Sequence, residues 1–146
     1  MMYGRADKKG KVSPHVPRWI HDAVHEIAFH LDKGRKTVRD GEAARKIVMT
    51  AFHDATTINR LAPYFWKTYQ REYLIWPGHD DHEDIKKLIQ FPKEPLKRLH
   101  IRFSKEEVKA LSDIENALDA PLAHTVCALL ILALQQERVI QHIAPT

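Results

Sequence analysis

The chain has 146 residues, of which 44% are hydrophobic and 29% charged, with a formal net charge of +4 and an isoelectric point near 9.2. This composition predicts one compact globular domain or two very small ones. It excludes an internal disulfide, because Cys127 is the only cysteine, and no apolar run reaches the ~18–20 residues that span a bilayer. The N-terminus is basic and lacks the apolar core of a secretory signal, so we expect a cytoplasmic protein without a membrane partner.

Positive charge is concentrated at the beginning of the chain. Residues 1–50 hold 11 Lys/Arg against 6 Asp/Glu, whereas residues 104–146 hold 3 against 6. Such a distribution suits a polyanion such as nucleic acid, although a solvated basic surface produces the same pattern. Residues 1–11 are expected to form a flexible basic arm.

The first predicted elements are a strand and a helix. Residues 12–17 alternate apolar and polar side chains, which is typical of a short strand with one buried face. Pro17 suits the first turn of a helix, where no backbone N–H is needed. The helix is indicated by apolar residues at spacings of four, three and four and is expected to end at Gly34. These apolar residues are Ile20, Val24, Ile27 and Leu31.

A basic loop over residues 35–37 leads to a second predicted helix, which begins at about Asp40. Apolar residues recur along it with the period of a helix, so one side is expected to face a core. That inner side is formed by Ala44, Ile47, Val48, Ala51 and Phe52.

The middle of the chain, residues 54–96, is rich in aromatic residues. We predict a helix after Pro63 that ends before Pro77, and a short helix over residues 81–91. The aromatic side chains are expected to cover a core between two small units. The alternative is stacking on single-stranded bases, because basic residues lie among them. The aromatic residues are Tyr64, Phe65, Trp66, Tyr69, Tyr73 and Trp76, and the basic ones are Lys67 and Arg71.

The final third begins with a second alternating segment, residues 97–103. Leu99, Ile101 and Phe103 fall on one face of a predicted strand, and Arg98, His100 and Arg102 fall on the other. The spacing of Ser104 and Glu107 predicts a capping box that opens a helix from Lys105 to about Leu118. A second helix is expected from Pro121 to about Gln136, and its residues 126–134 are apolar on every side, which predicts burial all round. Cys127 lies there and is expected to be a small buried hydrophobe rather than a reactive thiol.

The two ends of the chain carry the same pattern. An offset of 87 residues places Val12, Pro14 and Val16 on Leu99, Ile101 and Phe103, and it places Pro17 on Ser104 at the helix start. For the second helices the offset becomes 82, which places Ile47-Val48 on Leu129-Leu130. The apolar helix is expected to pack against Ile47, Val48 and Phe52.

This order of basic strand, helix start, first helix, short loop and apolar second helix resembles the ribbon-helix-helix family of DNA-binding proteins, the fold of the Arc and MetJ repressors. Residues 97–136 carry the resemblance best. Two such units in one chain resemble the tandem form found among accessory proteins of conjugation and T-DNA processing. The resemblance implies a mainly α fold with a short two-stranded antiparallel ribbon, built as a tandem ribbon-helix-helix pseudo-dimer with a helical linker. The expected parts are an arm (1–11), a first unit (12–53), an aromatic-rich helical linker (54–96) and a second unit (97–146).

The resemblance implies sequence-specific binding of double-stranded DNA by insertion of the ribbon into the major groove, either in DNA processing as a relaxosome-type or T-DNA-type factor or as a transcriptional repressor. The expected base-contacting residues are Arg98, His100, Arg102, Lys11, Ser13 and His15. The expected phosphate-contacting residues are Arg35, Lys36, Thr37, Arg39, Lys8 and Lys9. The loop before the last apolar helix has no Lys or Arg, so the first unit is expected to hold the backbone while the second reads bases.

Other functions are also weighed. One alternative is an antitoxin-like or other interaction factor whose aromatic middle binds a protein, such as a relaxase, an ATPase or a toxin. Another is a homodimer with a single C-terminal unit. No enzyme, cofactor or metal is expected. His21 and His25 lie one helical turn apart and form a possible metal pair, but the H-E-x-x-H signature is absent because His30 follows Glu26 one residue too late. Residues 79–84 could bind a cation, but their acidic residues are better explained by a helix N-terminus and a solvated loop.

Overall fold

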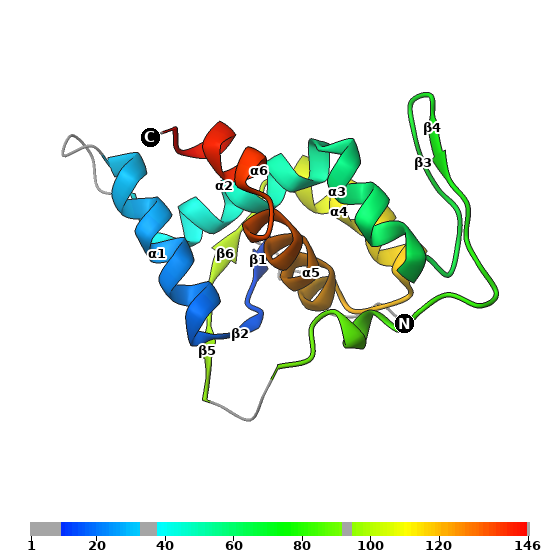
Figure 1. The fold of residues 1–146 in the computed structure, drawn as a ribbon, viewed down its shortest axis with the longest axis horizontal. Coiled ribbons are helices and arrows are strands. Elements are labelled where there is room, and N and C mark those ends of the chain that lie inside the picture. Colours follow the sequence, from blue (N-terminus) through cyan, green and yellow to red (C-terminus); the bar gives the residue numbers. More distant parts are fainter. Residues whose placement is uncertain (1–9, 33–37, 92–94, 146) are drawn as a thin grey trace.

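The computed structural model describes residues 10–32, 38–91 and 95–145. The chain is mainly helical, with short antiparallel two-stranded pairings between helical layers (Figure 1). The elements are, in chain order, β1 (Lys11–Val12), β2 (His15–Pro17), α1 (Arg18–Asp32), α2 (Asp40–His53), α3 (Ala55–Leu61), η1 (Ala62–Tyr64), β3 (Tyr69–Arg71), β4 (Leu74–Trp76), η2 (Ile85–Lys87), β5 (Leu96–Arg98), β6 (Ile101–Arg102), α4 (Lys105–Leu118), α5 (Leu122–Leu134) and α6 (Glu137–Ile143).

The two segments that alternate in the sequence pair with each other. β1 pairs antiparallel with β6, and β2 pairs antiparallel with β5. Hydrogen bonds from Leu99 N to Pro14 O (3.0 Å) and from Phe103 N to Gly10 O (2.9 Å) belong to the same ladder. Pro14 has no N–H to donate, which explains the break in regular pairing between the two short strand pairs. We call the paired residues 10–17 and 96–103 the ribbon.

A pair of helices follows each ribbon strand. α4 begins with the predicted capping box: Glu107 N donates to Ser104 Oγ (3.2 Å), and Ser104 N donates to Glu107 Oε1 (2.7 Å). α4 ends at Asp119, whose φ of 51° is left-handed and turns the chain sharply into α5. The predicted starts of α2 and α4 and the strand assignments are confirmed.

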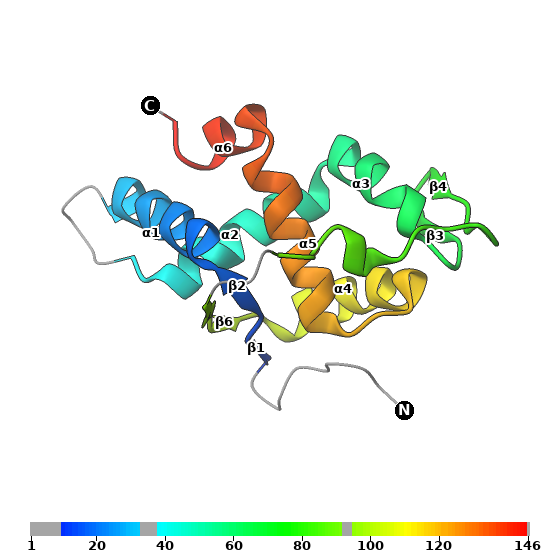
Figure 2. The ribbon, with the colours of Figure 1, turned by 60° about the horizontal axis from the view of Figure 1, so that its bottom comes forward.

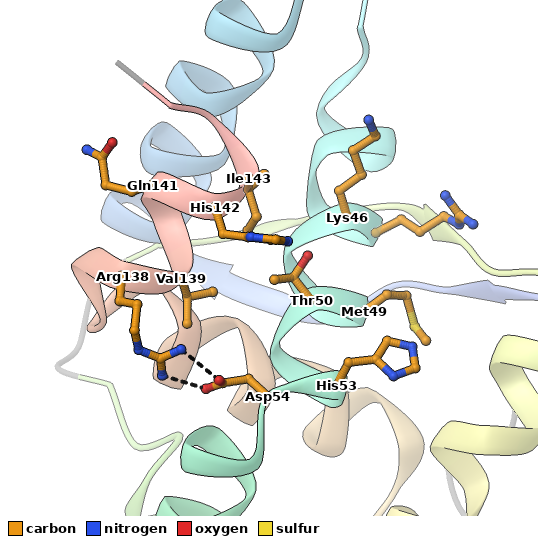
Figure 3. Close-up of a pocket in the computed structure, with 11 residues that line it drawn as sticks. Lys46, Met49, Thr50, His53, Asp54, Arg138, Val139, Gln141, His142 and Ile143 are labelled. Carbon is orange, nitrogen blue, oxygen red and sulfur yellow. Dashed lines mark hydrogen bonds and ion pairs between the residues drawn. The ribbon is translucent and has the colours of Figure 1, made fainter.

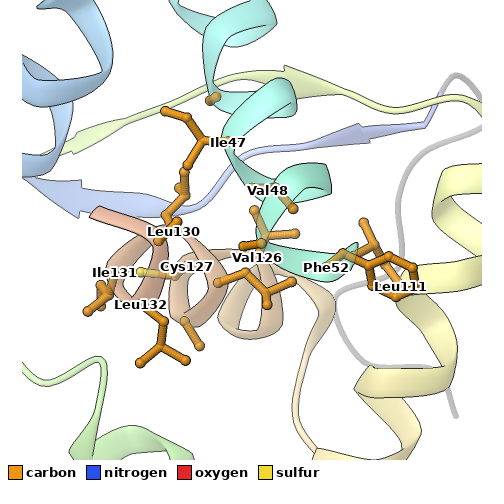
Figure 4. Close-up of a cluster of buried hydrophobic side chains, with 14 of the residues drawn as sticks. Ile47, Val48, Phe52, Leu111, Val126, Cys127, Leu130, Ile131 and Leu132 are labelled. Carbon is orange, nitrogen blue, oxygen red and sulfur yellow. The ribbon is translucent and has the colours of Figure 1, made fainter. Parts of the chain in front are cut away.

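α5 lies at the centre of the molecule, and α2 packs along it (Figures 2 and 4). α1, α3, α4 and α6 also contact α5. Leu129 and Leu130 are fully buried, as are Ile47 and Val48 on α2. The prediction that the all-apolar helix packs against α2 is confirmed. Cys127 is buried within it, and this burial raises the pKa of its thiol to about 12, so the thiol stays protonated.

No single helix in the described ranges has the length and apolar composition needed to cross a membrane. α4 and α5 meet that criterion only jointly, across a bend of 94°.

The structure corrects the prediction for the middle of the chain. The helix expected after Pro63 is wrong: a 3-10 turn at η1 is followed by the β3–β4 hairpin (Figure 1). The aromatic residues here follow strand alternation, because Tyr69 and Trp76 are cross-strand partners whose rings stack at 5.5 Å. The helix expected over 81–91 is reduced to the 3-10 turn η2, which Asp84 caps through Lys86 N (2.9 Å).

Two helices were absent from the sequence prediction. α3 starts one residue after α2 ends, where Asp54 accepts hydrogen bonds from the backbone and hydroxyl of Thr57. α6 follows α5 after a break at Gln136. Both are seven residues long, too short for a periodic apolar pattern to stand out. The end of the first helix expected at Gly34 falls outside the described residues.

Candidate nucleic-acid interface

The ribbon has one buried face and one polar face. Six of its inward residues are buried, whereas Lys97, the inward partner of Val16 at the end of the ribbon, is exposed. The buried residues are Val12, Pro14, Val16, Leu99, Ile101 and Phe103. On the outer face His15, Arg98, His100 and Arg102 are exposed, and Lys11 and Ser13 are half-buried. The alternation predicted from the sequence therefore places all six expected base-contacting residues on one surface.

The outer-face residues meet across the two strands in three pairs. Lys11 is opposite Arg102, and His15 is opposite Arg98. Between these pairs, Ser13 Oγ lies 3.0 Å from His100 Nδ1. Because Pro14–Leu99 and Gly10–Phe103 are hydrogen-bonded pairs, the outer-face pairs occupy the alternate positions, where side chains approach most closely.

The outer face is positively charged. Neither ribbon strand contains Asp or Glu, and Arg98 and Arg102 are exposed on the outer face. Arg98 Nε donates a hydrogen bond to His15 Nε2 (3.0 Å), and the two terminal nitrogens of Arg98 have no hydrogen-bond partner within the described ranges. Such an arginine can donate a bidentate pair of hydrogen bonds to a ligand.

The N-terminus of α2 abuts the ribbon. A Cβ at Gly41 would lie 2.2 Å from the carbonyl oxygen of His100, so only glycine permits this approach. Arg39 precedes the helix, is exposed, and supplies no side-chain cap. Asp40 lies in the first turn of α2. Its Oδ1 is 2.9 Å from His25 Nδ1, and its Oδ2 is 3.9 Å from His21 Nε2. The remaining expected phosphate contacts lie outside the described residues: Lys8, Lys9, Arg35, Lys36 and Thr37.

The α5 N-terminus differs from that of α2. Pro121 precedes it without a side-chain cap, and its first turn carries no acidic residue. His124 in that turn has a pKa lowered by burial and by the positive charge of Lys86, so it is neutral at pH 7. The start of α5 offers no exposed cation comparable to Arg39.

Both histidine-rich segments have structural partners. His21 and His25 share Asp40, and the ring of His82 packs edge-on against Trp66 at 4.7 Å. Within the described part of the chain, no group of three or more His, Cys, Asp or Glu side chains could hold a metal ion.

A groove of about 860 Å³ lies between α2 and α6 (Figure 3). Arg138 donates to both carboxylate oxygens of Asp54 (2.8 and 2.9 Å), and these hydrogen bonds hold the pKa of Asp54 at about 2 despite partial burial. Arg45 at the other end is bonded in the same bidentate manner to Glu107. Sequence reasoning missed this groove because it missed α6. The Asp54 carboxylate in this groove is engaged by hydrogen bonds from Arg138 and Thr57.

The aromatic middle divides into a buried and an exposed set. Phe65, Tyr69 and Trp76 are buried, and Trp76 Nε1 donates to Asn59 Oδ1 (2.7 Å). The guanidinium of Arg71 lies over the Phe52 ring at 4.1 Å. The predicted core role is confirmed for these side chains. The exposed set comprises Trp66, Tyr73, Leu74 and Ile75.

Comparison of the chain with protein-family models, with curated proteins and with solved structures found no match.

Proposed function

We propose that this chain binds double-stranded DNA with the outer face of the ribbon, as a single-chain tandem ribbon-helix-helix protein. One observation carries the proposal: two strands from opposite ends of the chain pair antiparallel, bury the apolar residues of one face and present a cationic face free of carboxylates. The major groove of B-DNA admits a two-stranded ribbon, and exposed arginines on such a ribbon can reach the base edges.

The observed register supports two related units. Under the offset of 87 residues, Lys11 corresponds to Arg98 and His15 corresponds to Arg102. The pair Lys11–Arg102 is therefore equivalent to the pair Arg98–His15, and Ser13 is opposite its own equivalent, His100. A ribbon with local two-fold symmetry has this property, with its centre between Ser13 and His100.

In this proposal the second strand reads bases and the first unit holds the backbone. Arg98 and Arg102 suit guanine O6 and N7 in the major groove, and each such contact contributes about 1–3 kcal/mol of discrimination. Arg39, with the expected contacts Arg35, Lys36, Thr37, Lys8 and Lys9, would neutralise phosphates. The proposal covers both transcriptional repression and DNA processing, because both would use the same DNA-binding surface.

The test is DNA binding as a function of salt, using a duplex enriched by the protein from a random-sequence pool. We expect R98A/R102A to lose most of its preference for that duplex over random DNA. The matched control is R60A/K67A, which removes the same charge from exposed positions on α3 and beyond, away from the ribbon. If both variants bind with the same specificity as the unaltered chain, the ribbon is not the reading surface.

A second candidate function rests on the hairpin. Tyr73 is 98% exposed, and Leu74 and Ile75 at its tip are largely exposed. Apolar side chains gathered on a projecting hairpin are typical of a protein-binding surface (Figure 1). If the hairpin binds a protein, replacing Tyr73 and Ile75 with serine should abolish capture of that partner and leave the preference for the enriched DNA duplex unchanged.

A further inference from the structure

We propose that His15 is a positioning residue that orients Arg98 to read a guanine, rather than a base-contacting residue itself. The inference rests on the proposed function, because it names the base and the device by which one end of the ribbon selects it. It assigns unequal roles to two residues that the alternation alone places on the same face.

The hydrogen bond between the two side chains fixes which edge of Arg98 is free. Arg98 Nε donates to His15 Nε2 over 3.0 Å, so this edge of the guanidinium is directed across the strands. The two terminal nitrogens remain, and they form the pair of parallel donors that matches guanine O6 and N7. Restricting the arginine before binding reduces the conformational entropy lost on binding.

The other end of the ribbon pairs a different type of residue with its arginine. Arg102 is opposite Lys11, whose ammonium group has three donors and no acceptor, so Lys11 cannot accept a hydrogen bond from Arg102 as His15 accepts one from Arg98. The acceptor histidine therefore belongs to the Arg98 end of the ribbon.

The arrangement requires the unprotonated form of His15 Nε2. A histidine protonated on both nitrogens cannot accept the hydrogen bond and places a second positive charge beside Arg98. Among the described residues, Lys97, Arg98 and His100 lie near His15 on the ribbon, and His124 and Cys127 line a cavity of about 430 Å³ that His15 shares; none of these five is a carboxylate.

The experiment locates the guanine and then measures its coupling to His15. In the enriched duplex, each guanine is replaced in turn by 7-deazaguanine, which lacks the N7 acceptor. The guanine read by Arg98 is the one whose replacement weakens the unaltered chain by about 5- to 150-fold but has little effect on R98A. At that guanine we expect H15A to lose most of the discrimination while retaining affinity for random DNA.

Two further variants separate positioning from structure. H15Q keeps an acceptor oxygen at the end of its side chain, so it should retain more of the discrimination than H15A does. H53A removes an exposed histidine that lies on α2 and not on the ribbon, and it should leave the coupling at this guanine intact. If H15A discriminates as well as the unaltered chain, the positioning role is overturned. If discrimination depends on Arg98 but not on His15, the proposed DNA-binding function stands and the positioning role fails. If R98A/R102A keeps the full discrimination of the unaltered chain, both the proposed function and the positioning role fail.

Discussion

In the N-terminal half of the chain (residues 10–53) the second helix, α2, buries one side and carries Arg45 and Lys46 on the other. In the C-terminal half (residues 96–134) the equivalent helix, α5, buries ten of its thirteen residues. The two helices pack against each other, and Ile47-Val48 and their equivalents under the 82-residue offset, Leu129-Leu130, are all fully buried, yet only α5 is enclosed. The difference arises because α3, η2 and α6, which lie outside both halves, cover the faces of α5 that α2 leaves open. Segments inserted between two similar units, or added after them, can thus enclose the second helix of one unit while that of the other stays partly exposed.

The strands differ in the opposite sense. The N-terminal strand contains two prolines and a half-buried serine at its centre, whereas the C-terminal strand carries both arginines and ends in a strong helix start. The half that contributes most to the core also contributes most of the exposed charge on the ribbon. Each prediction below tests one aspect of this unequal division.

The largest expected effect concerns the shared core. Leu129 and Ile47 occupy equivalent positions and are both fully buried. Replacing either with alanine leaves a cavity between α5 and α2 and should lower the free energy of unfolding by about 2–5 kcal/mol. Urea denaturation followed by circular dichroism measures this. Because the helices share one core, both variants should shift the same single transition.

A separate core in each half would give a different result. In that case L129A or I47A would lower one transition and leave a second unchanged. I47V, which removes a single methyl group and should cost about 0.5–1.5 kcal/mol, keeps the comparison measurable if the alanine variants do not fold.

The helix starts provide an intermediate effect. Ser104 caps α4, whereas the equivalent position before α1 is Pro17, which has no side chain that could accept a hydrogen bond. S104A should lower the free energy of unfolding by about 1 kcal/mol. K105A, a change at an exposed residue of the same turn, should alter it by less than about 0.5 kcal/mol. Equal losses in the two variants would mean that the capping box contributes nothing.

The smallest effect concerns the ion pair that joins α6 to the end of α2. Asp54 has a pKa of about 2 in the folded protein against 3.8 unfolded, chiefly because of the hydrogen bonds from Arg138. The stability it contributes is therefore present above about pH 4 and is lost as the pH falls toward 2. Solvent screens the pair because Arg138 is 60% exposed, so R138A should lower the free energy of unfolding at pH 7 by less than S104A does. Below about pH 2 the variant and the unaltered chain should be equally stable, and a difference that persists there would assign the effect to packing.

Much of both halves follows from local patterns in the sequence. The alternation around Arg98 and the Ser104–Glu107 spacing predict the second strand and the start of α4, because period and cap chemistry act over only a few residues. The β3–β4 hairpin could not be predicted in this way. Its aromatic residues pair across strands, as Tyr69 does with Trp76, and the same composition also suits an amphipathic helix.

The sequence predicts which residues lie on each face of the ribbon, but it does not predict which side chains contact each other across the strands. Period-two alternation assigns His15 and Arg98 to the outer surface. The hydrogen bond between them depends on the register of two strands far apart in the chain, which nothing local determines. The groove beside Asp54 was missed for a related reason, since its second wall is a seven-residue helix.

The pairing of Ser13 with His100 also has a consequence for folding kinetics. These residues are 87 positions apart, so the ribbon can form only after a very long loop has closed. Helices can form from local contacts before that closure, but the cationic surface cannot exist in a partly folded chain. A nascent chain acquires this surface only when its last third has been synthesised, and removal of either strand eliminates it.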